Sequence, residues 1–391
     1  MSKQIFIPVA IIVYAITSLL SFQIFAKSKI AGVNSGSKYS APVQDGKTAD
    51  TTGPKTEECP INGEMLTKGQ KSLWEKRRPL TVMIENHEES RPQSGLTSAD
   101  VVYEAVAEGG ISRFVAVYYC KDSDGYVGPI RSARVYFIDF ASEYGEKPLY
   151  VHVGGANCNK TTGSGCANGA PADAMGMLDR MGWTANNDLN FIPFPVMWRD
   201  YERLPGVATE HTVYSTTKKL WDYAKKERNL TEVDEDGSRW DKNFTKWKFK
   251  EDKPSSKPLT TIAFDFWEGK SDYSIAWNYS KETNSFKRLN GGQPHIDKNN
   301  NKQIESKNVI IAFMDESVAN DGYQGGEHML YDNTGSGDAI VFQDGQAVKG
   351  VWKKPTATSR IRFFDKSDKE ILLNRGQTFI EIVPTGNKIT Y

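Results

Sequence analysis

The 391-residue sequence has few cysteines and histidines, and it lacks the spacings that identify several familiar kinds of site. No HExxH helix and no Cys-x-x-Cys pair is present, which argues against a zinc site with the usual ligand spacing. The G-x-S-x-G motif of a serine nucleophile does not occur. Gly163-x-Gly165 follows no clear strand-to-helix pattern, so we do not interpret it as a nucleotide-binding motif. We therefore predict no metal from the spacing, and the sequence leaves the cofactor unknown.

An excess of charge of either sign is also missing. The 49 Lys and Arg residues are balanced by 49 Asp and Glu residues. This balance argues against a protein that wraps a polyanion, so no nucleic-acid partner is expected. Hydrophobic residues make up 38% of the chain and aromatic residues 11%. These fractions fit a soluble, strand-rich body that is long enough for more than one domain.

One long hydrophobic run is present, Ile5–Ala26, and its 22 residues carry no charge. A membrane-spanning helix needs about 20 such residues. A cleaved signal peptide would have a shorter apolar core. It would also end in a cleavage site of small residues, and Ile24-Phe25-Ala26 matches such a site poorly. We predict that residues 1–26 are an uncleaved, single-pass anchor in the cell membrane with the body on the extracytoplasmic side. A cleaved signal is the alternative.

Composition divides the rest of the chain into three parts. Residues 27–58 contain too few apolar residues to offset their ordering entropy, so we predict a disordered linker. Residues 59–250 mix short apolar runs with helical patterns and predict an α/β domain. After the segment KPSSKP, residues 258–391 contain many short apolar runs separated by turn residues, and predict a β-rich domain.

Several elements of the α/β domain can be placed. Short apolar runs predict strands at Leu80–Glu85, Asp100–Val106, Ser112–Cys120 and Leu149–Val153. Ser132 can cap a helix that follows it, and an amphipathic helix is predicted over Ser215–Arg228.

Polar residues are unusually dense between these strands, over Ile84–Arg134. The segment GPIRSAR places Arg131 and Arg134 at the predicted start of a helix, where cations oppose the helix dipole. A bound anion would compensate, because arginine forks suit phosphate and carboxylate groups. Asn86, His87, Arg91 and Arg113 are further candidates for holding such a ligand. The alternative is that the arginines pair with internal acids such as Glu104, Glu108 or Asp139.

Acids and histidines of the same region are candidates for chemistry. Asp100, Glu104 and Glu108 recur at steps of four, which keeps them on one face of a strand. Such a row can bind Mg²⁺ or Ca²⁺, or it can pair with the arginines. His152 ends an apolar strand and His211 precedes a helix, and each is either a general base or a structural histidine.

The four cysteines indicate the compartment. Cys158 and Cys166 flank the small polar loop NKTTGSG, and we predict a disulfide that closes it. Zinc ligation and free thiols are the alternatives. Together with the anchor, a disulfide indicates the oxidising, extracytoplasmic side of the membrane. Cys59 and Cys120 are assigned no role.

Long stretches of the sequence resemble a known family. The first half contains RPLTVMIENHEESRPQSGLTSADVVYEAVAEGGISRFVAVY, VGPIRSARVYFIDFASEY and YVHVGGA. The second half contains KNVIIAFM, GSGDAIVFQDGQAVKGVWKK and NRGQTFIEIV. These stretches are similar to the YerB-like family of bacterial lipoproteins. The resemblance implies a two-part domain with a layered α/β fold, and it supplies no reaction and no catalytic residues. Because this chain lacks a lipid-accepting cysteine, a spanning helix would replace the lipid.

The pattern of strands and the resemblance together predict a mixed α/β, β-rich fold with a layered β/β/α, sandwich-like body. Three functions fit the site residues. The first is an envelope module that binds an anionic ligand, such as a glycan or wall precursor. The second is a metal-assisted phosphoryl-transfer or hydrolytic enzyme with Glu104 and Glu108 on the metal. The third is a protein-binding scaffold, which internal pairing of every arginine would favour.

Overall fold

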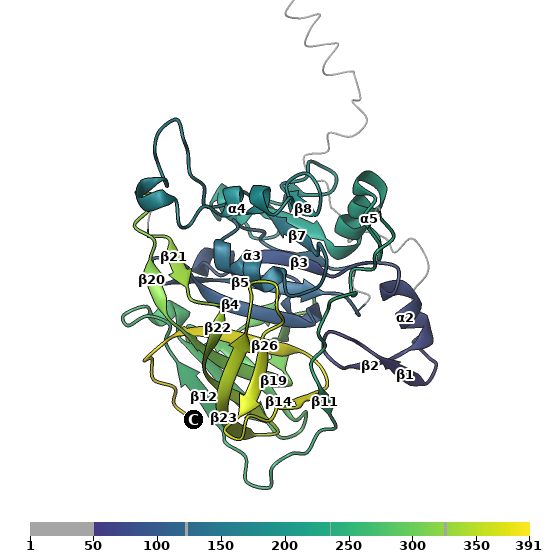
Figure 1. The fold of residues 1–391 in the computed structure, drawn as a ribbon. Coiled ribbons are helices and arrows are strands. Elements are labelled where there is room, and N and C mark those ends of the chain that lie inside the picture. The colour runs from purple at the N-terminus through teal and green to yellow at the C-terminus, as the bar shows by residue number, and fades with distance from the viewer. Residues whose placement is uncertain (1–50, 122–123, 235, 324–326) are drawn as a thin grey trace, which may run out of the picture. The chain divides into compact units, whose positions relative to one another are not determined.

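The computed structural model describes residues 51–121, 124–234, 236–323 and 327–391 (Figure 1). Strands and short helices are mixed up to Arg228, and the described residues after it form strands and one 3-10 turn without an α-helix. The predicted anchor Ile5–Ala26 and residues 27–50 of the predicted linker lie outside these ranges. Inside them, no helix combines the length and the apolar character needed to cross a bilayer. The end of the predicted disordered linker is ordered, because Lys55–Glu58 (β1) pairs with Met65–Thr67 (β2).

A ten-stranded mixed sheet is the framework of the described residues. Its strands, in spatial order, are β24 (Arg362–Asp365), β23 (Gln346–Lys354), β22 (Gly335–Gln343), β19 (Asn308–Met314), β26 (Thr378–Pro384), β4 (Val101–Glu108), β5 (Ile111–Tyr118), β3 (Leu80–Glu85), β7 (Leu149–His152) and β8 (Asp188–Asn190). The predicted mixed, β-rich α/β class is confirmed.

Strand β26 joins the two halves of this sheet, because it lies between β19 and β4 and runs parallel to both. In the register of β26 and β4, Glu381 stands opposite Glu104. Strands from residues 59–250 and from residues 258–391 therefore share one sheet, and the described residues lie within one compact unit. The division of the chain into two domains stays a prediction.

A second sheet is formed by β12 (Thr261–Phe264), β13 (Ile275–Ser280), β14 (Ser285–Asn290), β15 (Gln293–Pro294) and β18 (Glu305–Ser306). The remaining strands are short. Both β6 (Tyr126–Val127) and β9 (Trp198–Arg199) pair with β10 (Val213–Thr216). The other three sheets have two strands each, and they are β11 (Phe249–Lys250) with β25 (Leu373–Asn374), β16 (Ile296–Asp297) with β17 (Lys302–Gln303), and β20 (Glu316–Val318) with β21 (Met329–Tyr331).

The α-helices of the described residues are short: α2 (Lys68–Trp74), α3 (Val135–Ala141), α4 (Ala174–Arg180) and α5 (Thr217–Arg228). Helix α3 packs against β5 and α4, and α5 follows β10 directly in the sequence. Helix α5 was predicted two residues longer at its start; Thr216 is its N-cap and accepts a hydrogen bond from the N–H of Lys219.

Helix α3 begins later than predicted. Its N-cap is Arg134, whose backbone is extended (φ -135°, ψ 151°), and Ser132 takes no part in the cap. The preceding residues are bonded as extended chain, because the N–H of Arg131 donates to a carbonyl of β3 (3.0 Å) and the N–H of Ala133 donates to the carbonyl of Gly154 (3.0 Å). Arg131 therefore precedes the helix instead of lying in its first turn.

Strand β4 is covered on both faces. Tyr103 stacks on Phe140 of α3, with ring centroids 4.9 Å apart. The next residue, Glu104, bonds to Arg288 of β14 on the opposite face, as the alternation of side chains along a strand requires. Helix α3 and the second sheet thus lie on opposite faces of the large sheet at this strand. The layered arrangement of the whole body stays a prediction.

Two disulfides, Cys59–Cys120 and Cys158–Cys166, contain all four cysteines. The second closes the NKTTGSG loop. The first joins residues 61 positions apart, and it ties the segment after β1 to the end of β5. Neither pair has thiolates left to ligate a metal.

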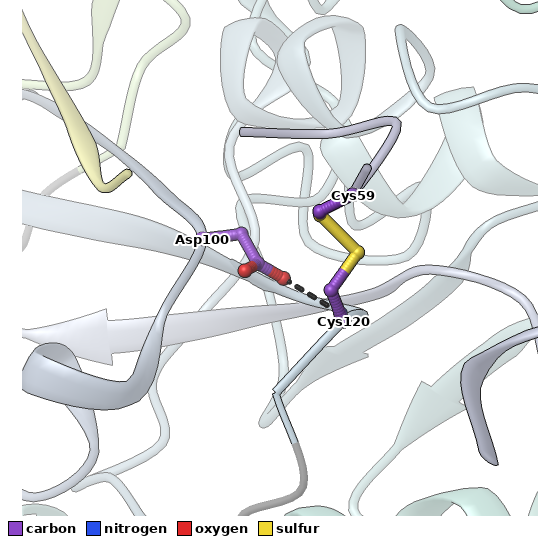
Figure 2. A group of neighbouring side chains, drawn as sticks. All are labelled: Cys59, Asp100 and Cys120. Atoms are coloured by element: carbon purple, nitrogen blue, oxygen red, sulfur yellow. Dashed lines mark hydrogen bonds between the residues drawn. A yellow bond between two sulfur atoms is a disulfide. The ribbon is translucent and has the colours of Figure 1, made fainter. Parts of the chain in front are cut away.

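Asp100 is fully buried beside the first disulfide (Figure 2). Its carboxylate accepts hydrogen bonds from the backbone N–H groups of Tyr119 (2.7 Å) and Cys120 (3.0 Å) and from the side chain of Asn62 (2.8 Å). Burial outweighs the opposing effects of Lys121 and of the two N–H donors, and it raises the pKa of Asp100 to about 6.

The variant Asp100→Asn should reduce the dependence of stability on pH. Because the pKa of about 6 in the folded state exceeds the ordinary value of about 3.9, the folded state binds this proton more tightly than the unfolded chain. The wild-type protein therefore gains stability below pH 4 that is lost as the pH rises through 6, on the order of 2–3 kcal/mol. Urea unfolding at pH 4 and pH 8 measures this difference, which should be smaller in the variant by about that amount. An equal pH dependence in both proteins would contradict the assignment.

Candidate functional site

Several of the predicted site residues lie at one end of the large sheet. Glu85 ends β3, His152 ends β7, Glu108 ends β4, and Arg113 lies near the start of the antiparallel strand β5. The parallel strands β3 and β7 bring their carboxyl ends to the same edge. The segments that follow or face these ends contribute His87, Arg131, Arg134 and His211.

The first group of side chains, which we call the His211 cluster, consists of Glu85, His87, Glu89, Arg131 and His211. Glu85 is 2% exposed and has two partners. Its Oε1 accepts from Arg131 Nε (2.9 Å), and its Oε2 is bonded to His211 Nδ1 (2.7 Å). The rings of His87 and His211 stack with centroids 4.8 Å apart, and His211 Nε2 lies 3.5 Å from Glu89 Oε2.

Hydrogen bonding and charge set the ionisation of this cluster. The bond to Glu85 raises the pKa of His211, although burial and Arg131 oppose the rise. Burial would by itself raise the pKa of Glu85, but the bond from His211 and the charges of Arg131 and Arg113 hold it below its ordinary value. Glu85 is therefore an anion that orients both His211 and Arg131.

Among the four predicted arginines, Arg131 is the one whose two terminal nitrogens are both without a hydrogen-bond partner in the described part of the chain. Only its Nε is bonded, and neither Nη1 nor Nη2 has a hydrogen-bond partner among the described residues. Its side chain is 24% exposed. Its acidic partner is Glu85, which was not among the acids proposed from the sequence.

A second group surrounds Glu108. Its Oε1 accepts from Arg113 Nη2 (2.6 Å), and its Oε2 accepts from Arg134 Nη2. Burial disfavours its ionisation, but the two guanidinium groups hold the pKa of Glu108 well below its ordinary value. Arg134 is thus paired with an internal acid, which was the alternative stated from the sequence.

The acids Asp100, Glu104 and Glu108 do not form the expected row on one face. Strand β4 begins after Asp100, and a register shift between Val106 and Glu108 interrupts the alternation of its side chains. Each acid has partners of its own, namely Asn62 for the first, Arg288 for the second, and Arg113 with Arg134 for the third. The three acids share no partner at which one Mg²⁺ or Ca²⁺ would bind.

Glu104 belongs to a buried network that connects the large sheet to β14. Arg288 Nη2 donates to Glu104 Oε2, while Ser112 Oγ and Asn86 Nδ2 lie 2.5 and 3.1 Å from Oε1. Burial, together with the charge of Glu104, raises the pKa of the neighbouring Glu381 well above its ordinary value. One arginine therefore faces two carboxyl groups, and the raised pKa favours the neutral form of Glu381.

Asn86 and Arg91 also serve this interior contact. Asn86 Oδ1 accepts from Arg91 Nε (3.2 Å), Gln93 Nε2 (2.9 Å) and Asn290 Nδ2 (2.7 Å). Arg91 Nη1 donates to the carbonyl of Asp272 (2.7 Å), and its Nη2 donates to the carbonyl of Asn86 (3.0 Å). Every nitrogen of this guanidinium group is bonded within the protein.

His152 is fully buried and has separate partners. Its Nε2 is bonded to Asp188 Oδ1 (2.7 Å), and its Nδ1 is bonded to the carbonyl of Gly154 (2.6 Å). Both ring nitrogens are occupied, so this geometry fits the structural alternative for His152 better than that of a general base.

Clefts lie elsewhere on the described surface. Three of them, of about 570, 670 and 360 Å³, are lined by residues of the α3 end and of the C-terminal strands. None of the three is lined by Arg91, Arg113, Arg131 or Arg134. The predicted arginines thus line none of these three clefts: Arg113 and Arg134 are buried, and Arg131 is partly exposed.

Sequence reasoning missed several members of these groups. Glu85 directly precedes the Asn86-His87 pair, and Glu89 follows the pair after Glu88. The available signal for Glu85 was its position as an acid at the end of an apolar strand. Arg288 gave no local signal, because it lies 184 positions from its partner Glu104.

The fold defines a mixed, β-rich α/β protein whose two halves share one sheet. Residues 66–231 match the model described as "Protein of unknown function (DUF3048) N-terminal domain", and residues 262–380 match that of its C-terminal domain. The chain belongs to this family, and the predicted resemblance is confirmed.

The relatives agree with this family. The chain is 29% identical over 310 residues to "Putative lipoprotein YerB" of Bacillus subtilis (strain 168), which is 79% of this chain and 82% of that protein. The crystal structure of YerB from Bacillus subtilis has a TM-score of 0.65 and 23% sequence identity, and the match covers 86% of this chain and 100% of that one. At this identity the structural match shows a shared fold.

Two sets of substitutions in the buried network should have unequal costs. Glu381→Gln replaces a neutral group and keeps the oxygen that accepts from Trp277 Nε1 (2.9 Å), so the free energy of unfolding should change by less than about 1.5 kcal/mol. Adding Glu104→Gln leaves Arg288 without any carboxylate, and the double variant should lose about 3–5 kcal/mol. Urea unfolding at pH 7 measures both. If Glu381→Gln alone costs as much as the double variant, Glu381 is ionised and the assignment is wrong.

Proposed function

We propose that this protein is a membrane-anchored, extracytoplasmic protein of the cell envelope that binds an anionic ligand, such as a glycan or wall precursor, through Arg131. The observation that carries the proposal is the half-satisfied guanidinium group. Glu85 fixes Arg131 at Nε, while Nη1 and Nη2 have no partner among the described residues and the side chain is 24% exposed. Such a fork is oriented in advance for a carboxylate or phosphate.

The charge around Arg131 supports the same proposal. The three guanidinium groups of Arg113, Arg131 and Arg134, together with the protonated imidazole of His211, face the three carboxylates of Glu85, Glu89 and Glu108. The surplus positive charge at this end of the sheet attracts an anion. The reason differs from the one drawn from the sequence, because Arg131 precedes helix α3 and the helix dipole does not act on it.

The envelope location rests on three observations. The uncharged run Ile5–Ala26 has the length of a membrane span. A relative carries the name "Putative lipoprotein YerB", which describes a lipid-anchored protein. Two disulfides fit an oxidising compartment.

A protein-binding scaffold is the second candidate. Arg91, Arg113 and Arg134 are each bonded to groups within the protein. If Arg131 also has only its structural role with Glu85, the whole arginine group is architecture, and the partner surface lies elsewhere.

Arg131→Gln should weaken anion binding much more than it weakens the fold. Loss of a charge-assisted fork should raise the Kd for inorganic phosphate or for soluble anionic peptidoglycan fragments about 10- to 100-fold, as measured by isothermal titration calorimetry. Because Glu85 keeps His211 as a partner, the free energy of unfolding should fall by only about 1–3 kcal/mol.

The matched control is Arg180→Gln. The Arg180 side chain is 69% exposed and lies 3.9 Å from Asp173, outside the His211 cluster. It should leave both binding and stability unchanged. If wild-type protein binds neither probe, or binds them as well after Arg131→Gln, the ligand proposal fails and the scaffold candidate stands.

Protease treatment of intact cells tests the topology. A single span at Ile5–Ala26 with an extracytoplasmic body predicts that added protease degrades the body, while a cytoplasmic marker survives. If the body survives while an external control protein is cut, the predicted orientation is wrong.

A further inference from the structure

Three side chains of the His211 cluster point potential metal ligands at one another. One ligand atom from each of His87, Glu89 and His211 lies within 4.8 Å of the other two. The shortest of these separations that involves the carboxylate is 3.5 Å, between Glu89 Oε2 and His211 Nε2. In sequence, His87 and Glu89 are two positions apart and His211 is distant, so the histidine spacing alone gave no sign of the group.

The surroundings of His211 are those of an oriented metal ligand. Its Nδ1 is bonded to Glu85 Oε2 (2.7 Å), and the other oxygen of Glu85 accepts from Arg131 Nε (2.9 Å). A carboxylate on one ring nitrogen fixes the tautomer and the ring plane of a metal-bound histidine, and it leaves the other nitrogen free for the metal. Here the free nitrogen is Nε2, which is the atom that faces Glu89.

To bind an ion, Glu89 must draw closer to His211 and the ring of His87 must rotate out of its stack on His211, because an ion lies in the plane of each imidazole that binds it. Tetrahedral ligands at about 2.0–2.1 Å from zinc are roughly 3.3 Å apart. The ligand atoms must therefore draw together from at most 4.8 Å. The side chain of Glu89 is 52% exposed and can move, whereas the nearly buried His211 is held by Glu85.

We propose that His87, Glu89 and His211 bind one divalent transition-metal ion, with zinc as the preferred ion. Two imidazoles and one carboxylate form a borderline ligand set, which favours zinc over the hard cations Mg²⁺ and Ca²⁺. Three protein ligands leave a fourth position open for water or for an anion. This inference goes beyond the anion proposal and does not depend on it, because none of the three ligands is Arg131.

The contacts among His87, Glu89 and His211 can also be explained without a metal, and this explanation predicts a different result. Protonated His211 would form ion pairs with Glu85 and Glu89, and the ring of His87 would stack on it. Under that explanation, Zn²⁺ binds no better to wild-type protein than to a protein without His87.

The experiment uses the full-length, untagged chain in detergent, stripped of metal and titrated with Zn²⁺ in competition with a chromophoric chelator. We expect one Zn²⁺ per chain, and a visible absorption spectrum when Co²⁺ replaces it. His87→Ala and Glu89→Gln should each weaken Zn²⁺ binding at least about 100-fold, because each removes one of three ligands. Glu88→Gln, at an exposed neighbouring acid outside the group, should bind Zn²⁺ like wild type.

Circular dichroism and urea unfolding show whether each variant is folded before its affinity is compared. His87 and Glu89 are not buried, so both variants should fold. The proposal is overturned if wild-type protein binds no Zn²⁺, if His87→Ala and Glu89→Gln bind it as wild type does, or if Glu88→Gln loses it equally. Saturable binding of Mg²⁺ or Ca²⁺ instead of Zn²⁺ would overturn the assignment as well.

Discussion

The buried ion pair between Glu104 and Arg288 is the contact on which the arrangement of the two halves depends. Both side chains are fully buried, one on β4 of the large sheet and the other on β14 of the second sheet. The rings of Phe114, Trp277 and Phe379 lie 5.2 to 5.6 Å from the Arg288 guanidinium group. Burying either charge without its partner would cost on the order of 3–5 kcal/mol. The two sheets must therefore pack together in the one register that brings Glu104 and Arg288 into contact. Such a pair specifies a unique arrangement more than it adds stability.

The same network places the surface groups. The side chain of Asn86 points inward to Glu104 and Ser112, and the next residue, His87, belongs to the His211 cluster. The chain therefore passes from the buried network to the surface within one residue. A change in the docking of the second sheet would move His87 and the residues after it, because Arg91 is bonded to the carbonyl of Asp272 in the C-terminal half.

The sequence was informative where structure is set locally. The apolar run Leu80–Glu85 is strand β3 with the predicted bounds, and the run from Leu149 is β7. The start of α3 was misplaced, because hydrogen bonds to β3 and to Gly154 keep residues 131–133 extended. Periodicity contains no information about such bonds.

Side-chain partners were predictable only in kind. Arginines paired with acids were expected as an alternative, yet Arg131 pairs with Glu85, 46 positions away, and Arg288 pairs with Glu104. From the sequence alone, several acids are equally good partners for a given arginine. Only the way the strands pack together in the fold selects one of them. The pairing of Cys59 with Cys120, across 61 positions, has the same origin.

The place of β26 in the large sheet has a consequence for biosynthesis. This strand follows the other nine strands of the sheet in sequence, yet it lies between β19 and β4. Until Thr378–Pro384 has left the ribosome, both neighbours present unpaired N–H and C=O groups along a sheet edge. The nascent chain is therefore open to wrong pairing and aggregation at these two strand edges until β26 has been made. Chaperones that cover strand edges, or export of the chain in an extended state, would protect it until this strand arrives.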